Sequence, residues 1–492
     1  MSMTKDVRAV LRLRALRLLA LSSLLALFAA IVFSSGNTVR DPDIWWHLKV
    51  GDWTVEHHMV PYTGIFSRTA ATRPWIAYSW GYEVLLSRCY AWFGLLGVAL
   101  FGIVLTIVVA FTLFWMLHRL CGSFWVAWIL LLIGSFAYLF SLMPRPVFFT
   151  MIFYTVELTL ILEAQRTGRI QSLYCLIPIF VLWANVHIQF IYGLFVIGLF
   201  VGINVLQRVA GLAKRDLRFL EPPSLPLIPL LGILAACFGA TFVGPYSYHV
   251  YSVVATYSRS QVPYFMIQEL AAFDFNQFTH YVLLLLACTA FFVLGGRRKL
   301  SAFKLSLLVV ASAIAFRTQR DAWFLGIAAT IVIADYRSAE EASVPALRAP
   351  ELAGVCAMVT LFVFLVASNT GFNTRNLDRT ISRQYPVNAV NFLRQNPVSG
   401  PLYNTLDWGG FLIWYMPQYP VAIDGRNDLY GDELDLRLFK SEQGDSYTSD
   451  PYLNEAGVLL LPKNGPLAKL LIADTHFRIA YQDQLSVVYV RN

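Results

Sequence analysis

The chain has 492 residues, of which 57% are hydrophobic and only 14% carry a charged side chain. A soluble protein of this length has about 25% charged residues, so the composition excludes an ordinary soluble globular protein. The net charge of +8 is concentrated in particular loops between apolar segments, which indicates membrane topology and not nucleic-acid binding.

Apolar segments recur along the chain, and many approach the roughly 20 residues that a helix needs to cross a bilayer. The first follows a group of basic residues, as in a signal peptide, but we expect an uncleaved anchor because the topology requires this span. The chain is predicted to be a polytopic α-helical membrane protein with about eleven spans. They lie near 15–35, 95–117, 122–141, 147–164, 172–186, 188–206, 225–243, 279–295, 302–317, 321–336 and 351–368. The stretch 172–206 can alternatively form a single bent helix.

Lysine and arginine are concentrated in alternate loops, and this asymmetry predicts the orientation of the chain. If the N-terminus is cytoplasmic, the loops 118–121, 165–171, 207–224, 296–301 and 337–350 lie inside, and every one of them contains lysine or arginine. The loops 36–94, 142–146, 244–278 and 317–321 and the turn around 187 then lie outside, as does the C-terminal end.

The chain changes character after about residue 368. The segments 420–424 and 458–461 are typical of buried strands, 466–474 of a helix, and 477–490 of a closing strand pair. We therefore expect two domains: a transmembrane domain over 1–368, and a soluble extracytoplasmic α/β domain over 369–492. The six cysteines are scattered and form no C-x-x-C pair, so neither a disulfide framework nor a zinc site is indicated.

Polar residues that are costly beside a membrane gather on the predicted outer face. They are Asp41, Asp43, Trp46 and His47 after the first span, Arg145 before 147–164, Asn185 and His187 in the next outer turn, Glu269 in the long loop, and Arg317 and Arg320 in the turn near 317–321. Guanidinium groups bind phosphate oxygens bidentately, and a carboxylate can deprotonate an acceptor or coordinate a cation. These residues therefore predict a pocket that binds a lipid phosphate carrier. The predicted reaction is the transfer of a group from that carrier.

Each candidate also has a purely structural interpretation. Asp41 or Asp43 can cap the next helix, and Pro42 between them makes it unfavourable for both to stack on one helical turn. The arginines can anchor to lipid headgroups, Glu269 can pair with Arg259, and Asn185 and His187 can satisfy a helix break.

Several motifs, taken in order, resemble the GT-C glycosyltransferases, and more closely their bacterial members related to protein mannosyltransferases. The first outer loop reads D-P-D-I-W-W-H at 41–47, V-P-Y-T at 60–63 and W-G-Y-E at 80–83. R-P at 145–146, L-W-A-N-V-H at 182–187, N-T-L-D-W-G-G at 404–410 and I-D-G-R at 423–426 continue the resemblance. The chain departs from the pattern in the proline that separates the two acidic residues, and in Gly244-Pro245 where Asn-Pro is expected.

The resemblance implies an inverting transfer of a sugar from a polyprenyl-phosphate donor to an extracytoplasmic lipid, glycan or protein acceptor. A first-loop aspartate, Asp41 or Asp43, is then the base. The residues themselves favour Asp43 slightly, because it lies closer to the Trp-Trp-His stretch. The resemblance also implies a bacterial inner membrane as the location. A divalent cation is a possible cofactor, although the first loop shows no complete ligand set. The alternatives are a ligase or polymerase of lipid-linked glycans, a transporter or flippase of an anionic lipid-linked substrate, and an inert scaffold. Transporters usually bind near mid-bilayer, whereas these polar residues lie at span ends.

Overall fold

The computed structural model describes residues 5–34, 37–136, 143, 145–213, 218–262, 267–336, 349–370 and 373–492. Contacts divide the chain into two compact units, and each unit is assembled from segments that are distant in the sequence. We call them the helical unit (Met1–Ser35, Gly102–Gly244 and Gln268–Gly371) and the mixed unit (Gly36–Phe101, Pro245–Ile267 and Phe372–Asn492).

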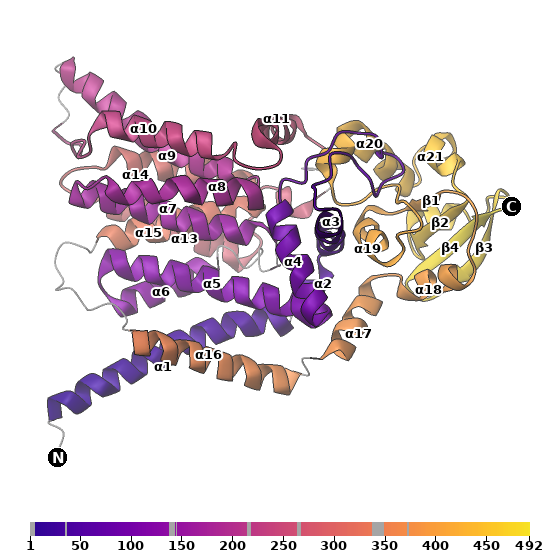
Figure 1. The fold of residues 1–492 in the computed structure, drawn as a ribbon, viewed down its shortest axis with the longest axis horizontal. Helices are drawn as coiled ribbons and strands as arrows, with labels where there is room; N and C mark the ends of the chain where they lie inside the picture. Colours follow the sequence, from indigo (N-terminus) through magenta and orange to yellow (C-terminus); the bar gives the residue numbers. More distant parts are fainter. Residues whose placement is uncertain are drawn as a thin grey trace. The chain divides into compact units, whose positions relative to one another are not determined.

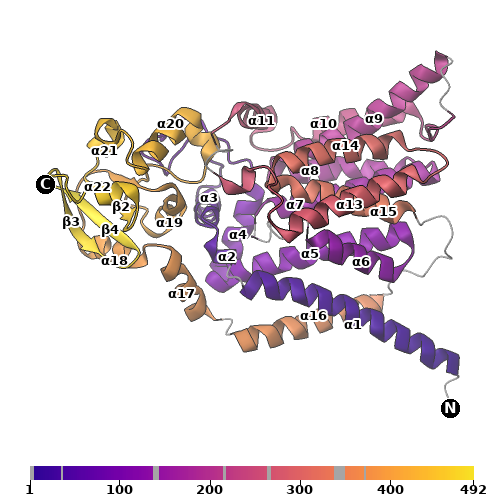
Figure 2. The ribbon, with the colours of Figure 1, turned by 180° about the vertical axis from the view of Figure 1, so that it is seen from behind.

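The helical unit is a bundle of apolar helices (Figures 1 and 2). α15 (Ala322–Tyr336) is buried on nearly every face and packs against α6, α7, α13 and α14, as expected for a helix that is hydrophobic all round. The other helices are α1 (Lys5–Ser34), α5 (Leu95–Cys121, which begins in the mixed unit), α6 (Phe124–Ser135), α7 (Val147–Thr167), α8 (Leu176–Val186), α9 (Phe190–Leu212), α10 (Leu227–Ala240), α13 (Phe278–Gly295), α14 (Ala302–Arg317) and α16 (Ala349–Thr370).

Every one of the eleven predicted ranges overlaps one of these helices, so the long apolar runs of the sequence correspond to helices. Within the described residues, five helices are long and apolar enough to cross a membrane: α1, α5, α7, α9 and α13. Several others, such as α6 and α10, are apolar but shorter. The chain is therefore a multi-pass membrane protein, and the number of eleven spans stays a prediction. Residues 137–141 of the third range and 337–348 of the last predicted inner loop lie outside the described residues.

The stretch 172–206 forms two helices and not a single bent one. α8 ends at Val186, and His187 adopts an extended conformation with φ −162° and ψ 139° before α9 begins at Phe190. The break therefore falls at one predicted site residue, His187, and directly after the last turn of α8, which carries another, Asn185.

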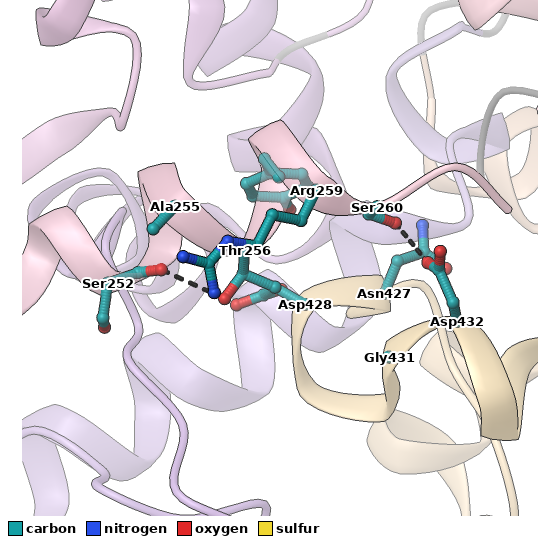
Figure 3. Close-up of a pocket in the computed structure, with 10 residues that line it drawn as sticks. Ser252, Ala255, Thr256, Arg259, Ser260, Asn427, Asp428, Gly431 and Asp432 are labelled. Carbon is teal, nitrogen blue, oxygen red and sulfur yellow. Dashed lines mark hydrogen bonds between the residues drawn. The ribbon is translucent and has the colours of Figure 1, made fainter.

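The mixed unit combines short helices with one small sheet. Its helices are α2 (Asn37–Arg40), α3 (Asp43–His57), α4 (Trp80–Phe93), α11 (Val250–Arg259), α17 (Thr374–Gln384), α18 (Val387–Gln395), α19 (Leu406–Tyr415), α20 (Asn427–Glu442), α21 (Pro451–Asn454) and α22 (Pro466–Leu470). α11 contacts α20 directly. Asp432 of α20 accepts a hydrogen bond from the hydroxyl of Ser260, which lies just past the end of α11 (Figure 3). Asp432 also accepts the Gln261 N–H at 2.8 Å.

The sheet has four strands in the order β1-β2-β4-β3, with β1 (Leu402–Asn404), β2 (Val458–Pro462), β3 (Phe477–Gln482) and β4 (Ser486–Arg491). β1 runs parallel to β2, and the remaining pairs are antiparallel. The prediction of a strand near 458–461, a helix from 466 and a closing strand pair is confirmed.

The prediction of a strand at 420–424 is wrong. This segment joins no sheet. Its only strand-like pairing within the described part of the chain is an isolated bridge between Val421 and Ser67 of the first outer loop. Its backbone groups are bonded instead by loop and side-chain atoms: Val421 O accepts from Arg68 N at 2.8 Å, and Asn404 Oδ1 accepts from Ala422 N at 2.8 Å. From the sequence alone, a short apolar run flanked by turn residues looks like a strand. Its hydrogen-bond partners decide whether it forms one, and here those partners are distant in the sequence.

This bonding attaches the first outer loop to the C-terminal part of the chain. Thr69 Oγ1 donates to Ala422 O at 2.5 Å, and the Arg68 guanidinium reaches Glu455 and the carbonyl of Tyr452. The mixed unit therefore contains the first outer loop, 36–94, together with residues 373–492. The division into a transmembrane domain and a soluble domain at residue 368 stays a prediction.

Candidate functional site

Asp41 and Asp43 stand at the start of α3, in different environments. Asp41 is 1% exposed, and its Oδ1 accepts the backbone N–H of Asp43 at 3.2 Å. An aspartate in this place stabilises the first turn of the helix because that N–H has no partner inside the helix. Asp43 is the first residue of α3 and remains partly exposed. The pair thus divides into a buried capping carboxylate and an accessible one.

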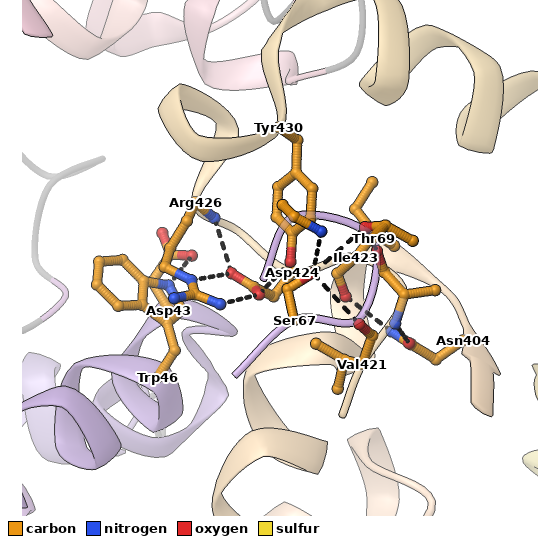
Figure 4. A network of polar contacts seen from close by, with 12 residues as sticks. Asp43, Trp46, Ser67, Thr69, Asn404, Val421, Ile423, Asp424, Arg426 and Tyr430 are labelled. Atoms are coloured by element: carbon orange, nitrogen blue, oxygen red, sulfur yellow. Dashed lines mark hydrogen bonds and ion pairs between the residues drawn. The ribbon is translucent and has the colours of Figure 1, made fainter. Parts of the chain in front are cut away.

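The Asp43 carboxylate is oriented by its neighbours (Figure 4). The indole Nε1 of Trp46, one turn along α3, donates to Asp43 Oδ1 at 3.0 Å. The backbone of Gly425 lies directly against the same oxygen, so that a Cβ at this position would overlap it. Gly410 likewise packs against the carbonyl of Pro42. The two glycines of the C-terminal motifs therefore permit the close approach of backbone to the first loop.

The imidazole of His47 contacts α4. Its Nδ1 shares a hydrogen bond of 3.0 Å with Glu83 Oε1, and both side chains are buried. Burial raises the pKa of Glu83 well above its usual value, and the positive charge of Arg426 opposes this shift. The pair connects α4 to α3, the helix that carries both His47 and Asp43. We therefore interpret His47 as a residue that fixes the position of α3. Glu83 was not among the predicted site residues, although its position in W-G-Y-E was visible in the sequence.

A buried network extends from the loop that contains Gly425 (Figure 4). Arg426 Nε and Nη2 donate to the two oxygens of Asp424 at 2.7 Å each, and the Tyr430 hydroxyl donates to the Asp424 carboxylate at 2.5 Å. The Arg426 guanidinium lies 4.8 Å from the ring centre of Trp75. A bidentate pair that is further hydrogen-bonded supplies the compensation that buried charges require. The internal ion pair is thus a structural support for the loop beside Asp43.

In the helical unit, three predicted residues meet at the ends of helices. Arg145 lies two residues before the start of α7, Glu269 lies in the short helix η4 (Gln268–Leu270), and Arg320 lies in η5 (Gln319–Asp321). Glu269 Oε1 is 2.6 Å from Arg145 Nη1 and 3.9 Å from Arg320 Nη1. Glu269 therefore pairs with these two arginines and not with Arg259. Arg317 ends α14 and is exposed.

His187 and Asn185 are held by hydrogen bonds within the helical unit. Thr150 Oγ1 lies 2.8 Å from His187 Nδ1 and accepts the indole N–H of Trp183 at 2.8 Å. The Asn185 amide donates to the carbonyls of Val181 and Val243 at 2.7 and 2.6 Å. The Thr150 hydroxyl on α7 had no marker in the sequence, because one threonine in an apolar helix is common.

These contacts continue to the turn that contains Arg320. Asp321 accepts hydrogen bonds from the Gln189 amide and the Tyr192 hydroxyl of the α8–α9 region, each at 3.1 Å, and from Thr318. The Gln319 N–H donates to Ala271 O at 3.0 Å, next to η4. Arg145, His187, Glu269 and Arg320 are therefore supported by one connected set of helix ends.

The predicted site residues thus form two groups. Asp41, Asp43, Trp46 and His47 belong to the mixed unit, and Arg145, Asn185, His187, Glu269, Arg317 and Arg320 to the helical unit. Throughout the described ranges, no three His, Cys, Asp or Glu side chains are gathered closely enough to hold a metal ion.

Comparisons of sequence find no family model and no curated protein that matches the chain. Solved structures do match its fold. The archaeal oligosaccharyltransferase AglB from Archaeoglobus fulgidus, in complex with an inhibitory peptide and a dolichol-phosphate, aligns over 96% of this chain and 74% of its own, with 11% identity and a TM-score of 0.54. The apo form of the same organism's oligosaccharyltransferase aligns over the same shares, with 12% identity and a TM-score of 0.51.

A third structure, ArnT from Cupriavidus metallidurans bound to undecaprenyl phosphate, aligns over 95% of this chain and 97% of its own, with 13% identity and a TM-score of 0.46. AglB and ArnT are both membrane glycosyltransferases of the GT-C superfamily. The structural likeness to AglB shows that this chain has a GT-C fold, as the motifs of its outer loops suggested.

Proposed function

We propose that this GT-C-fold chain is a membrane glycosyltransferase that transfers a sugar from a polyprenyl-phosphate donor to an extracytoplasmic acceptor. The observation that carries the proposal is the state of Asp43: an accessible carboxylate at the start of α3, oriented by the Trp46 indole at 3.0 Å and packed against Gly425. Fold alone does not establish an activity, so the proposal depends on what these side chains can do.

Asp43 is the proposed general base. Its carboxylate accepts a proton from the acceptor's nucleophilic group, which attacks the anomeric carbon of the donor sugar. The bond from that carbon to the phosphate oxygen breaks, and the polyprenyl phosphate leaves with the electron pair. A single displacement of this kind inverts the configuration at the anomeric carbon. Asp41 keeps Asp43 at the helix start by accepting its N–H, and is a positioning residue.

Arg145 and Arg320 are proposed to bind the phosphate of the donor. Two guanidinium groups directed at one carboxylate oxygen form an anion site, and a phosphate offers the same kind of acceptor with more charge. In the absence of donor, the Glu269 carboxylate occupies this anion site, and the donor phosphate displaces it. Preorganised cations stabilise the negative charge that develops on the leaving phosphate.

The proposal is tested in cells that lack the gene. Lipid-linked sugars are expected to accumulate in the deletion strain, as identified by mass spectrometry of the membrane lipids, and the wild-type gene removes them. Asp43→Asn is expected to leave the accumulation unchanged, because an amide cannot take the proton, while the protein is still inserted at wild-type levels.

Asp52→Asn is the matched control, because Asp52 lies on the same helix, further from its start, beside Lys49 at 3.8 Å. This variant is expected to restore the wild-type lipid profile. Full restoration by Asp43→Asn would remove Asp43 from the chemistry. No accumulation in the deletion strain would contradict the proposed donor.

A further inference from the structure

A cavity of about 450 Å³ lies in the mixed unit between α11 and α20 (Figure 3). Ser252, Thr256 and Arg259 of α11 face Asn427 and Asp428 at the start of α20 across it. The proposed function assigns none of these residues, and a cavity of this size accommodates one or two sugar rings better than a long peptide.

The lining offers a balanced set of hydrogen-bonding groups. The Ser252 hydroxyl already donates to His249 O at 2.7 Å, and the Thr256 hydroxyl to Ser252 O at 3.0 Å, so their oxygens remain as acceptors. Arg259 and the Asn427 amide supply N–H donors, and Asp428 supplies further acceptors. A sugar hydroxyl both donates and accepts hydrogen bonds. It can therefore pair with a cavity lining that supplies both donors and acceptors.

The charge of the cavity is close to neutral. Arg259 is exposed and forms no ion pair with any described residue, and Figure 3 shows its side chain turned towards Thr256 and Asp428. Asp428 opposes this cation, and the Asp432 carboxylate is occupied by Ser260 Oγ and by the N–H groups of Gln261 and Val262. A strongly anionic ligand would meet Asp428, and a cationic ligand would meet Arg259, so an uncharged ligand is favoured.

The cavity is connected to the proposed base by packed side chains. Asp428 lies close to Arg426 and the Trp75 indole, and both oppose the rise in its pKa, to about 7, that burial causes. The Trp75 ring centre is 6.2 Å from that of Trp46, which in turn donates to Asp43. A group bound in the cavity is therefore held within the same unit as the proposed base.

We propose that the cavity between α11 and α20 binds a neutral, polyhydroxylated group, a sugar ring, of the acceptor. The acceptor role rests on the proposed function, whereas sugar binding by itself does not. The acceptor class is accordingly a glycan or a glycosylated molecule, and the cavity determines which acceptors are used.

The test measures sugar binding directly. The full-length protein in nanodiscs is titrated with the methyl glycosides of glucose, mannose, galactose and N-acetylglucosamine, and binding is followed by saturation-transfer difference NMR. At least one of these sugars is expected to bind the wild type. Glucuronate and glucosamine, which are charged, are expected to bind at least tenfold more weakly than that sugar.

Two identical substitutions on α11 form a matched pair. Ser252 lines the cavity, whereas Ser258 does not, although both are exposed and each donates to a carbonyl three residues earlier. Ser252→Trp is expected to fill the cavity and abolish the sugar signal, and Ser258→Trp to retain it. Arg259→Ala is expected to weaken binding at least fivefold.

The outcomes separate this inference from the proposed function. If Asp43→Asn abolishes transfer but binds the sugar as the wild type does, both proposals are supported. If sugar binding is absent from the wild type, or is unchanged in Ser252→Trp, the cavity is not a sugar site, whatever the activity. Where transfer is measurable, Ser252→Trp is expected to raise the KM for the acceptor and to leave kcat within twofold. A loss of kcat without a change in KM contradicts acceptor binding at this cavity.

Discussion

Replacement of Glu269 by glutamine is expected to tighten the binding of polyprenyl phosphate. Glu269 holds the two arginines of the proposed phosphate site, with its Oε1 at 2.6 Å from Arg145 and 3.9 Å from Arg320. The donor phosphate must displace this carboxylate before it can bind. Glutamine preserves the size of the side chain and removes its charge, so the arginines are released at a smaller cost.

The size of the effect follows from the one short contact. A hydrogen bond to a charged group contributes about 1.5–3 kcal/mol, and exposed ion pairs contribute only about 0.2–1 kcal/mol. The side chains of Arg145 and Glu269 are 17% and 33% exposed, between these limits. A net release of about 1.4 kcal/mol corresponds to a dissociation constant about tenfold lower. Screening by salt should reduce the difference, because part of the pair faces solvent.

The assay is the dissociation constant of undecaprenyl phosphate for the full-length protein in nanodiscs, measured at low and at high salt. Glu351→Gln is the matched control, because Glu351 also pairs with an arginine of the helical unit, Arg14, at 3.4 Å. This control is expected to bind like the wild type. If Glu269→Gln binds equally or more weakly, Glu269 positions the arginines and does not occupy the place of the phosphate.

Three further predictions follow from single contacts. Arg145→Lys is expected to weaken undecaprenyl phosphate binding in the same assay by about tenfold, because a point charge replaces a bidentate fork; an unchanged affinity would place the phosphate elsewhere. Gly425→Ala is expected to displace the Asp43 carboxylate and leave lipid-linked sugars accumulated in the complemented deletion strain, whereas Gly239→Ala, whose added Cβ meets open space, restores them; a fully active Gly425→Ala would show that Asp43 needs no fixed orientation. Burial, with the nearby charge of Asp424, raises the pKa of Asp435 to about 8 in the folded protein. The resulting loss of stability is absent below about pH 4, grows as the pH rises, and is complete above about pH 8. Asp435→Asn should therefore raise the midpoint of thermal unfolding by several degrees at pH 9 and by clearly less at pH 5, and the same gain at both pH values would contradict this origin.

The secondary structure was predictable from the sequence where the signal is local. Long apolar runs located the helices of the bundle, and the segment 477–490 was predicted to form the closing strand pair, which is β3 and β4. Residues 420–424 show the limit of this signal. Their apolar composition is that of a strand, but their hydrogen bonds go to the first outer loop and to Asn404, and no local pattern encodes those partners.

For the candidate site too, some features could be predicted from the sequence and others depended on the tertiary structure. The sequence alone determined that the chain is an apolar, helical membrane protein, and it confined the acidic candidates to Asp41 and Asp43, because composition and motif order are properties of the chain itself. Only the tertiary structure decided that Asp41 is buried as a cap while Asp43 stays accessible, that Gly425 touches its carboxylate, and that Glu269 occupies two arginines. These features depend on segments that fold together from distant positions, and burial and pairing are set by those contacts and not by neighbours in the sequence.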